Sequence, residues 1–327
     1  MKTLILAGIC SLFVSTIAGF IIIPILKKLK AGQPILKYVE KHKNKNGTPT
    51  MGGLFFISSA VLVFFLFGGV KGRMATVSIT IGLAFMLVGF LDDFIKIKFN
   101  KNEGLKAYQK ILFQIGISIV AGVFSYTNGI TVFFIPFVNY TIDLNIWAIP
   151  VIAIIFIAVT NSVNLTDGLD GLAGNVSISY LVWILVLMCI QIQNYSNLYT
   201  QIYEYDSLKL VIVCFIGAIS SFLIFNTNKA KVFMGDTGSL AIGGIIASVS
   251  IFSLNSFFIP IIGIMFVVSS ISVIVQVAYF KKTKKRVFLM APLHHHFQLK
   301  GCSETQISYV YSLVTCFMGA ISVVFFI

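Results

Sequence analysis

A chain of 327 residues in which 57% are apolar and only 11% are charged has too few polar groups to cover a water-soluble globule, and its mean hydropathy of +0.96 places it in a bilayer. The net charge of +13 does not indicate nucleic-acid binding, because no recognition motif accompanies it. No polar segment is long enough for a soluble domain, so residues 1–327 are expected to form a single multipass membrane domain.

Ten apolar stretches follow one another, each long or nearly long enough to cross a hydrocarbon core that needs about 20 helical residues. They predict an all-α integral membrane protein of about ten transmembrane helices. The stretches are 4–26, 51–69, 74–91, 107–127, 146–162, 172–192, 208–225, 240–254, 257–280 and 305–326. The first could be a signal peptide, but its length favours an uncleaved span. The five cysteines show no disulfide or zinc spacing.

The connections between these spans fall into two sets, and 20 of the 24 lysines and arginines lie in or beside one of them. The positive-inside rule places this set in the cytoplasm and both termini on the outer side. The set consists of 27–50, 92–106 with Lys110 just beyond, 163–171, 226–239 and 281–304. The same charge could bind anionic lipid headgroups or concentrate a polyanionic substrate, and the sequence does not separate these uses.

The longest connection on the outer side, 128–145, begins with Asn128-Gly129 and continues in two runs with strand propensity. Ile130–Phe137 and the residues from Val138 onward predict a small hairpin at the outer membrane interface. No pattern in it is typical of chemistry.

Five of the seven aspartates lie at cytoplasmic ends of spans, in short polar motifs: Asp92, Asp93, Asp167, Asp170 and Asp236. Ionisable groups at a membrane boundary are costly to desolvate and usually mark function. Asp92-Asp93 ends the third span. Because neighbouring helical side chains point about 100° apart, these two carboxylates are expected to have different roles.

The second motif, Asn164–Gly171, places Asp167 and Asp170 three residues apart, which predicts one side of a helical turn. A helix cap could explain one of these aspartates but not both. The third motif, 226–239, brings Asp236 to the start of the eighth span, where oxygen ligands suit a hard cation or a phosphate.

Five carboxylates in one place repel one another unless cations are present, and Mg²⁺ together with lysines such as Lys45 or Lys110 would supply them. Mg²⁺ usually takes one or two carboxylates plus phosphate oxygens of a substrate. The sequence therefore predicts a Mg²⁺–phosphate site on the cytoplasmic face, and favours it over a structural or ion-transport role.

Two further polar motifs lie in the predicted cytoplasmic loops. Gly47–Gly53 can present amides and hydroxyls to an anion, although it is also typical of a turn that enters a span. His294, His295 and His296 follow one another, and consecutive histidines rarely converge on one metal ion. Contact with a substrate phosphate is the favoured interpretation of the histidines.

In their order and positions these motifs resemble those of the polyprenyl-phosphate N-acetylhexosamine-1-phosphate transferase superfamily, over nearly the whole chain. The most specific segments are Gly47–Gly53, Asp92-Asp93, Asn164–Gly171, Phe233–Ser239 and Pro292–Phe297. The triple histidine and the Gly-Thr-Pro-Thr-Met-Gly-Gly stretch are similar to those of the bacterial phospho-N-acetylmuramoyl-pentapeptide transferase branch, whose members lie in the cytoplasmic membrane.

The resemblance implies a Mg²⁺-dependent transfer of phospho-N-acetylmuramoyl-pentapeptide from UDP-N-acetylmuramoyl-pentapeptide to undecaprenyl phosphate, which releases UMP and forms lipid I for peptidoglycan synthesis. It implies that Asp236 and Asp92 hold the metal, and that Asp92, Asp93, Asp236 and His294 take part in catalysis. The residues that it implies in substrate binding are Lys45, Thr50, Lys110, Asn164, Asp167, Asp170, Asn226, Phe233, Gly235, His295 and His296. It also implies a homodimer, an outer hairpin and a ninth helix with a break, and Pro260 and Gly263 are compatible with that break.

Alternatives remain at this stage. The lipid phosphate could attack directly, which we favour, or Asp236 could form a covalent intermediate. The donor could be UDP-N-acetylglucosamine, as in related transferases. From another class, an ion-coupled transporter also needs intramembrane carboxylates, but here no internal repeat is visible and the acids gather at one face.

Overall fold

The computed structural model describes residues 2–29, 47–99, 104–138, 140–194, 199–227 and 229–325, and within these ranges the chain is mostly helical. The helices are α1 (Lys2–Lys28), α2 (Gly53–Leu66), α3 (Arg73–Phe99), α4 (Ala107–Thr127), α5 (Ala148–Thr166), α6 (Leu172–Asn194), α7 (Tyr199–Asn226), α8 (Gly235–Phe252), α9 (Ile259–Ile262), α10 (Ile264–Thr283), α11 (Leu293–Leu299) and α12 (Glu304–Val324). Two strands, β1 (Val132–Ile135) and β2 (Tyr140–Asp143), lie between α4 and α5.

In the described ranges, nine helices are long and apolar enough to cross a bilayer, which confirms an all-helical integral membrane protein. The second predicted span, 51–69, is shorter than expected, because α2 has only 14 residues. Its rise of about 21 Å falls short of a hydrocarbon core of about 30 Å. The chain turns away after Phe67, where Gly68 takes a left-handed conformation with a φ of 78°.

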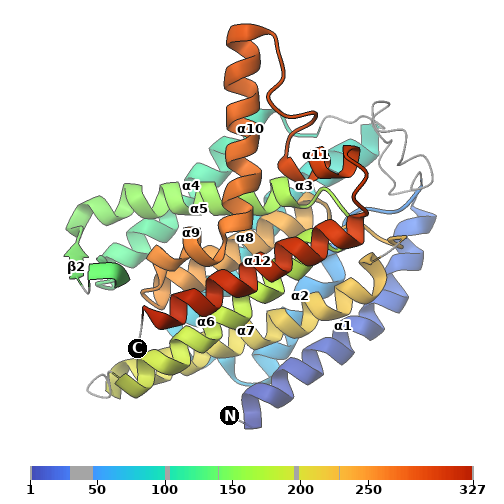
Figure 1. Ribbon diagram of the computed structural model, residues 1–327. Coiled ribbons are helices and arrows are strands. Elements are labelled where there is room, and N and C mark those ends of the chain that lie inside the picture. The colour runs from blue at the N-terminus through green and yellow to red at the C-terminus, as the bar shows by residue number, and fades with distance from the viewer. Residues whose placement is uncertain are drawn as a thin grey trace.

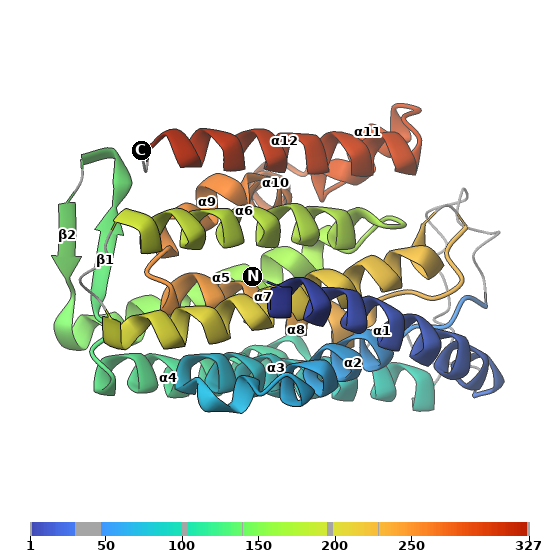
Figure 2. The same cartoon turned by 90° about the horizontal axis from the view of Figure 1, so that it is seen from below.

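Helix α8 forms the centre of the bundle, with α3 and α5 packed on it (Figure 2). Every residue from Thr237 to Phe252 is buried. Its many Gly, Ala and Ser residues let neighbouring helix backbones approach closely. Gly89 of α3 lies so near the backbone of Asp236 that a Cβ atom on it would collide there. The beginning of α8 is therefore held at a fixed height against α3.

Helix α1 packs along α7 through small polar side chains. Ser11 Oγ donates to Cys214 O at 2.6 Å, and Thr16 Oγ1 donates to Ser221 Oγ at 2.9 Å. Interhelical hydrogen bonds of this kind help to hold transmembrane helices together. The first apolar stretch is thus a helix packed within the bundle.

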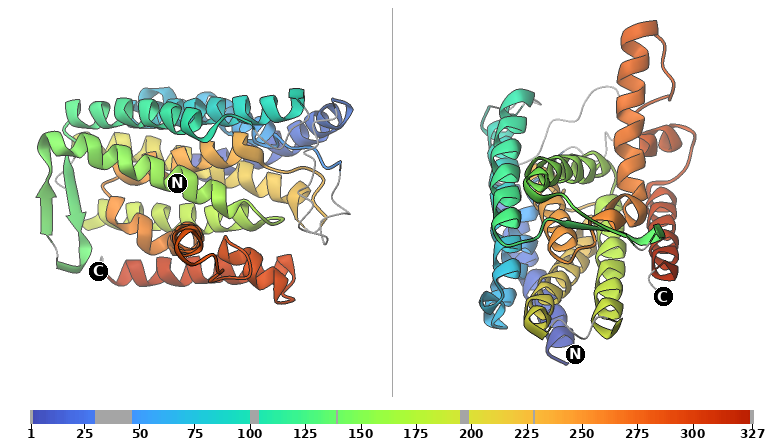
Figure 3. Two further views of the ribbon diagram at one scale, coloured as in Figure 1. Left: turned by 90° about the horizontal axis from the view of Figure 1, so that it is seen from above. Right: turned by 90° about the vertical axis from the view of Figure 1, so that its left-hand side faces the viewer.

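The predicted ninth span, 257–280, is broken as expected. α9 ends at Ile262, Gly263 follows it as a cap, and α10 begins at Ile264. Pro260 lies in the first turn of α9, where its missing N–H leaves no hydrogen bond unmade. Beyond the break, α10 runs steeply across the other helices and projects from the bundle (Figure 1 and Figure 3).

The predicted hairpin is present in the connection between α4 and α5. β1 and β2 are antiparallel, with Val132 opposite Asp143 and Ile135 opposite Tyr140. The hairpin closes one end of the bundle, and α11 lies at the other end (Figure 2). The aspartate motifs meet at the α11 end, so chemistry and hairpin are separated by the length of the helices.

Candidate active site

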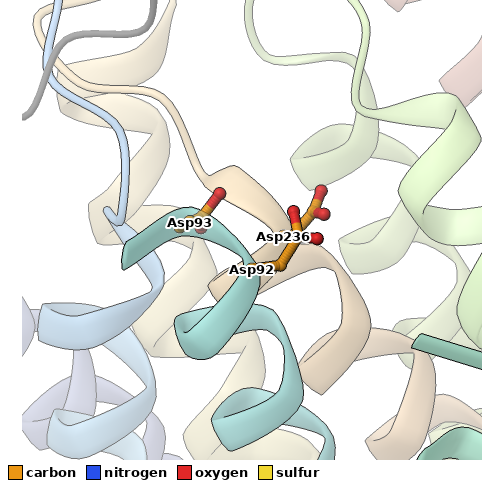
Figure 4. Close-up of side chains that lie close together, drawn as sticks. All are labelled: Asp92, Asp93 and Asp236. Carbon is orange, nitrogen blue, oxygen red and sulfur yellow. The ribbon is translucent and has the colours of Figure 1, made fainter. Parts of the chain in front are cut away.

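Three of the five predicted aspartates form a tight cluster. Asp92 and Asp93 project from α3, and Asp236 lies in the first turn of α8. One carboxylate oxygen from each side chain lies within 4.8 Å of the other two. The neighbouring Asp92 and Asp93 side chains leave α3 in different directions (Figure 4), as the helical geometry predicts. A cluster of this kind has the oxygen ligands that a hard cation prefers.

Backbone geometry brings the cluster together. Gly235 has a φ of 70°, a conformation that other residues adopt at a cost, and it turns the chain into α8. A side chain at Gly235 would collide with the carboxylate of Asp93 and the hydroxyl of Thr50. α3 also continues to Phe99, beyond the predicted end at residue 91, so the two aspartates lie within a helix and not in a loop.

Two lysines neutralise part of this charge. Lys96 Nζ lies 2.6 Å from Asp92 Oδ2, 3.9 Å from Asp93 Oδ1 and 3.3 Å from Asp236 Oδ2. Lys110 of α4 donates to Asp236 Oδ2 at 2.7 Å. Ion pairs this shielded from water require good geometry to offset the cost of desolvation, and these short distances provide it. The sequence prediction that Lys110 joins the aspartates is confirmed.

The three carboxylates have different surroundings. Asp93 Oδ2 accepts hydrogen bonds from the backbone N–H of Thr237 at 2.9 Å and from its hydroxyl at 2.7 Å. Asp92 Oδ1 accepts one from Leu105 N at 2.9 Å. Asp236 Oδ1 accepts one from Asn164 Nδ2 at 2.7 Å. Asp236 therefore has the most donors, and α3, α4, α5 and α8 all meet at this cluster.

Two carboxylate oxygens still lack a hydrogen-bond donor within the described ranges. Asp93 Oδ1 is buried and accepts no hydrogen bond, and Asp92 Oδ2 contacts the Lys96 ammonium without the geometry of one. Buried polar atoms without partners are rare and require an explanation. A divalent cation would satisfy both oxygens, so the residues fit the Mg²⁺ that the sequence predicts.

A cavity of about 260 Å³ opens beside the cluster. It joins the second and third aspartate motifs to Lys96 of α3 and to Thr50 of the Gly47–Gly53 segment. Its walls are Thr50, Lys96, Asn164, Asp167, Gly168, Leu169, Asp170, Asn226, Phe233, Gly235 and Asp236. Eight of the predicted site residues are in this set. Carboxylates, side-chain amides, one ammonium group and one aromatic ring therefore line the same cavity.

The predicted helical turn at Asp167 and Asp170 is wrong. α5 ends at Thr166 and α6 begins at Leu172, so both aspartates lie in the intervening turn. Asp170 Oδ2 accepts from Ala230 N at 3.0 Å and so holds the segment that precedes α8. Burial, reinforced by the charges of nearby aspartates, raises the pKa of Asp167 well above its usual range. Asp167 therefore takes up a proton more readily than an exposed aspartate.

Asn226 and Phe233 belong to the same segment, which pairs with the Gly47–Gly53 motif. Phe233 N donates to Pro49 O, and Gly52 N donates to Phe233 O, each at 2.8 Å. Asn226 accepts from Gly171 N through Oδ1 and donates to Val232 O through Nδ2, each at 2.8 Å. The segments expected to bind the nucleotide are thus one hydrogen-bonded unit. Lys45, the remaining residue predicted there, lies outside the described residues.

The three histidines do not act as a group. His294 is fully buried beside Gly168, a cavity residue, and neither of its ring nitrogens has a hydrogen-bond partner among the residues that the structure describes. His295 lies beside it, with the ring centroids 4.4 Å apart. His296 Nδ1 instead accepts from Leu289 N at 3.1 Å. Burial lowers the pKa of His294 to about 3, so its imidazole is neutral at physiological pH.

Comparison with known proteins decides the family. The model of Glycosyl transferase family 4 matches residues 74–254, and the Phospho-N-acetylmuramoyl-pentapeptide-transferase signature 1 matches residues 45–57. The chain is 41% identical to the phospho-N-acetylmuramoyl-pentapeptide-transferase of Clostridium botulinum, over 94% of this chain and 93% of that protein. It is 42% identical to that of Clostridium perfringens strain SM101 (97% and 95%) and 39% identical to that of Clostridioides difficile (94% and 93%).

The chain belongs to the phospho-N-acetylmuramoyl-pentapeptide-transferase family. This membership confirms the resemblance seen in the motifs and argues against an ion-coupled transporter. It also identifies the chain as a multipass protein of the bacterial cytoplasmic membrane.

Two residues at the site of this transferase are missing from the sequence prediction. Lys96 lines the cavity and contacts all three clustered aspartates. Its spacing from Asp92, four residues along a helix, is the signal that could have revealed it. Glu304, at the start of α12, accepts from Asp170 N at 3.0 Å and from Gln298 Nε2 at 3.3 Å. Glu304 lies in no motif, so only the fold shows that it ties α11 and α12 to the cavity loop.

Neutral His294 has a consequence for stability that can be measured. Its pKa of about 3 in the folded protein is below the value of about 6.5 for an exposed imidazole, so between these values the unfolded chain binds the extra proton. Stability is therefore full above about pH 6.5 and falls as the pH is lowered, by up to about 2 kcal/mol on reaching pH 5. We expect His294→Gln to remove this part of the acid sensitivity in thermal unfolding in detergent.

His296→Gln is the matched control for this measurement, because His296 lies two residues along the same helix and is only partly buried. The unfolding temperature of this control should depend on pH as steeply as that of the unaltered protein. An equally steep loss in the His294→Gln variant would contradict the assignment of a buried neutral His294.

Proposed function

We propose that this protein transfers phospho-N-acetylmuramoyl-pentapeptide from UDP-N-acetylmuramoyl-pentapeptide to undecaprenyl phosphate, releasing UMP and forming lipid I. The observation that carries the proposal is one cavity that joins Asp236 of the aspartate cluster and its neighbour Lys96 to the Asn226 and Phe233 wall. A uridine diphosphate needs both parts, since the base binds to amides and an aromatic face while the pyrophosphate requires cationic groups. The names of the curated relatives specify the muramoyl-pentapeptide substrate.

The residues act mainly by positioning and by neutralising charge, as is general in phosphoryl transfer. Lys96 and Lys110 place two ammonium groups at the end of the cavity where the pyrophosphate would lie. Asn226 and Phe233 bind the uracil, and Asp167 and Asp170 line the wall between the base and the reacting phosphates. His294 and His295 border this wall at Gly168, next to the position proposed for the sugar phosphate.

Mg²⁺ would be held by Asp92 and Asp236, with Asp93 Oδ1, which accepts no hydrogen bond from the described residues, beside them. When bound, it supplies positive charge to the phosphate oxygens and orients them for displacement. Asp93 Oδ2 accepts both of its hydrogen bonds from Thr237 and so fixes the start of α8. The role of Asp93 is therefore mainly to position α8, whereas Asp92 would bind the metal.

Direct attack by the lipid phosphate is the better supported mechanism. A covalent route requires Asp236 to act as nucleophile, yet both of its oxygens already accept hydrogen bonds, from Asn164 and from Lys96 and Lys110. These donors hold the carboxylate in place and reduce its electron density. A phosphate monoester, with a second pKa near 6, is largely deprotonated at neutral pH and needs little help from a base.

We also propose that the cavity end of the bundle faces the cytoplasm, with both termini outside. The lysines and arginines support this orientation, because 20 of the 24 lie in or beside the connections at the cavity end of the predicted spans. The homodimer that the family resemblance implies remains a prediction, and sedimentation or mass photometry in detergent would test it.

Donor selectivity tests the proposed function. Purified protein with undecaprenyl phosphate and Mg²⁺ is expected to release UMP from UDP-N-acetylmuramoyl-pentapeptide at least about 100-fold faster than from UDP-N-acetylglucosamine, because binding groups used by the peptide are left empty by the smaller donor. Chelation of the metal with EDTA should stop release, and added Mg²⁺ should restore it. UMP release from UDP-N-acetylglucosamine alone would contradict the substrate assignment.

A further inference from the structure

A pair of side-chain amides lies in the bundle directly beneath the active site. Gln114 of α4 is fully buried, and its Oε1 accepts from Asn161 Nδ2 of α5 at 2.7 Å. The return bond, from Gln114 Nε2 to Asn161 Oδ1, measures 3.5 Å. Asn161 Nδ2 also donates to Ile157 O at 2.7 Å, which fixes the direction of its amide. The two amides therefore join α4 and α5 at one defined level.

Both partners are one helical turn from a residue that contacts Asp236. Gln114 follows Lys110 by four residues, and Asn161 precedes Asn164 by three, so each pair shares a helix face. Lys110 binds Asp236 Oδ2 from α4, and Asn164 binds Asp236 Oδ1 from α5, each at 2.7 Å. The two oxygens of the Asp236 carboxylate thus accept hydrogen bonds from two different helices, α4 and α5. The distance between α4 and α5 determines whether both hydrogen bonds can form at the same time.

We infer that the Gln114–Asn161 pair is a positioning device for the transfer reaction, which sets the distance between α4 and α5 so that Lys110 and Asn164 orient the Asp236 carboxylate. This inference rests on the proposed function. Neither amide reaches the cavity, so neither is a catalytic residue. Their effect on the reaction passes through the geometry of Asp236, and misplacement of a reacting group by about 1 Å can cost about 100-fold in rate.

The molecule contains a matched pair that serves as its control. Gln191 of α6 and Asn255, after α8, are both buried and exchange two hydrogen bonds of 3.2 and 3.1 Å. This second amide pair lies at the opposite end of α8 from Asp236, near the hairpin end of the bundle. Its chemistry is the same and both of its members are buried, whereas Asn161 is partly buried; neither member of this second pair lines the cavity.

Exchanging the two partners tests the inference. Gln114→Asn shortens the amide bridge by one methylene, Asn161→Gln lengthens it, and the double variant restores its total length. We expect each single variant to lower kcat for UMP release by about 10-fold or more and the double variant to recover to within about threefold. KM for the UDP-linked donor should stay within about threefold throughout, because the Asn226 and Phe233 wall is unchanged.

Gln191→Asn and Asn255→Gln should lower the unfolding temperature in detergent by about as much as Gln114→Asn and Asn161→Gln do. Unlike those two variants, they should leave kcat unchanged. Equal losses of kcat in both exchanges, or no loss at Gln114 and Asn161, would overturn the inference while the unaltered protein remains active. An inactive unaltered protein would overturn the proposed function and this inference with it. If Asn161→Gln does not fold, Gln114→Asn compared with Gln191→Asn decides the question alone.

Discussion

Replacing Asp236 with asparagine is expected to reduce UMP release by about 1,000-fold or more while the protein still folds. Asp236 is the one carboxylate whose two oxygens meet donors from three other helices, through Lys96, Lys110 and Asn164. Asparagine has the same shape but removes the charge that holds both ammonium groups and any cation in place. Preorganised charge at a reacting phosphate has effects of about 100- to 1,000-fold for each group removed, and here one substitution disturbs several contacts.

Asp206→Asn is the matched control for this substitution. Asp206 is also paired with a lysine, Lys209 at 3.2 Å, but its side chain is 61% exposed. Its partner Lys209 is buried, but the Asp206 carboxylate faces water and does not line the cavity, so the control should retain its rate. Full activity in the Asp236→Asn variant would remove Asp236 from the reaction and leave the cluster with a purely structural role.

The sequence was sufficient to predict the class of fold and most of the site. Apolar length and charge bias predict the helices, because a bilayer imposes both constraints on any spanning segment. The break at Gly263 and the hairpin after Asn128 follow from local backbone rules in the same way. These features depend on short stretches of chain, and neighbours far away in the sequence hardly change them.

Features that depend on packing were harder to predict. The spacing of Asp167 and Asp170 predicts a helical turn. In the structure the Asp170 carboxylate accepts from Ala230 N and the Asp170 N–H donates to Glu304, and these two hydrogen bonds fix a non-helical turn. The span at 51–69 is cut short by Gly68. The histidines are adjacent in sequence, yet His294 and His296 face different surroundings because they lie on a short helix, α11.

The aspartate cluster shows the same limit within one site. Charge and motif order predict that all five aspartates gather with lysines such as Lys45 or Lys110, and the structure brings three of them, Asp92, Asp93 and Asp236, together with Lys110. Asp167 and Asp170 reach the same cavity but stand apart from the cluster. Lys96 was overlooked, because a lysine that follows a span is usually explained by topology alone.

Replacing Lys96 with methionine is expected to lower UMP release by about 100-fold and at the same time to reduce the Mg²⁺ concentration needed for half-maximal rate. The Lys96 ammonium lies between three carboxylates, at 2.6, 3.3 and 3.9 Å, where it neutralises charge that a divalent cation also seeks. Without it, the carboxylates attract Mg²⁺ more strongly. The rate still falls, because the ammonium that lines the cavity no longer meets the reacting phosphates.

Lys98→Met, two residues along the same helix, is the control for general effects of losing a lysine. Lys98 projects over the rings of Phe94 and Phe99 and contacts none of the aspartates. We expect its rate and Mg²⁺ requirement to match those of the unaltered protein. An increased Mg²⁺ requirement in Lys96→Met would mean that the lysine helps to assemble the metal site, whereas a decreased one would mean that the ammonium and the metal compete for the same oxygens. The short contact between Lys96 and Asp92 Oδ2, an oxygen without a hydrogen-bond donor, favours competition.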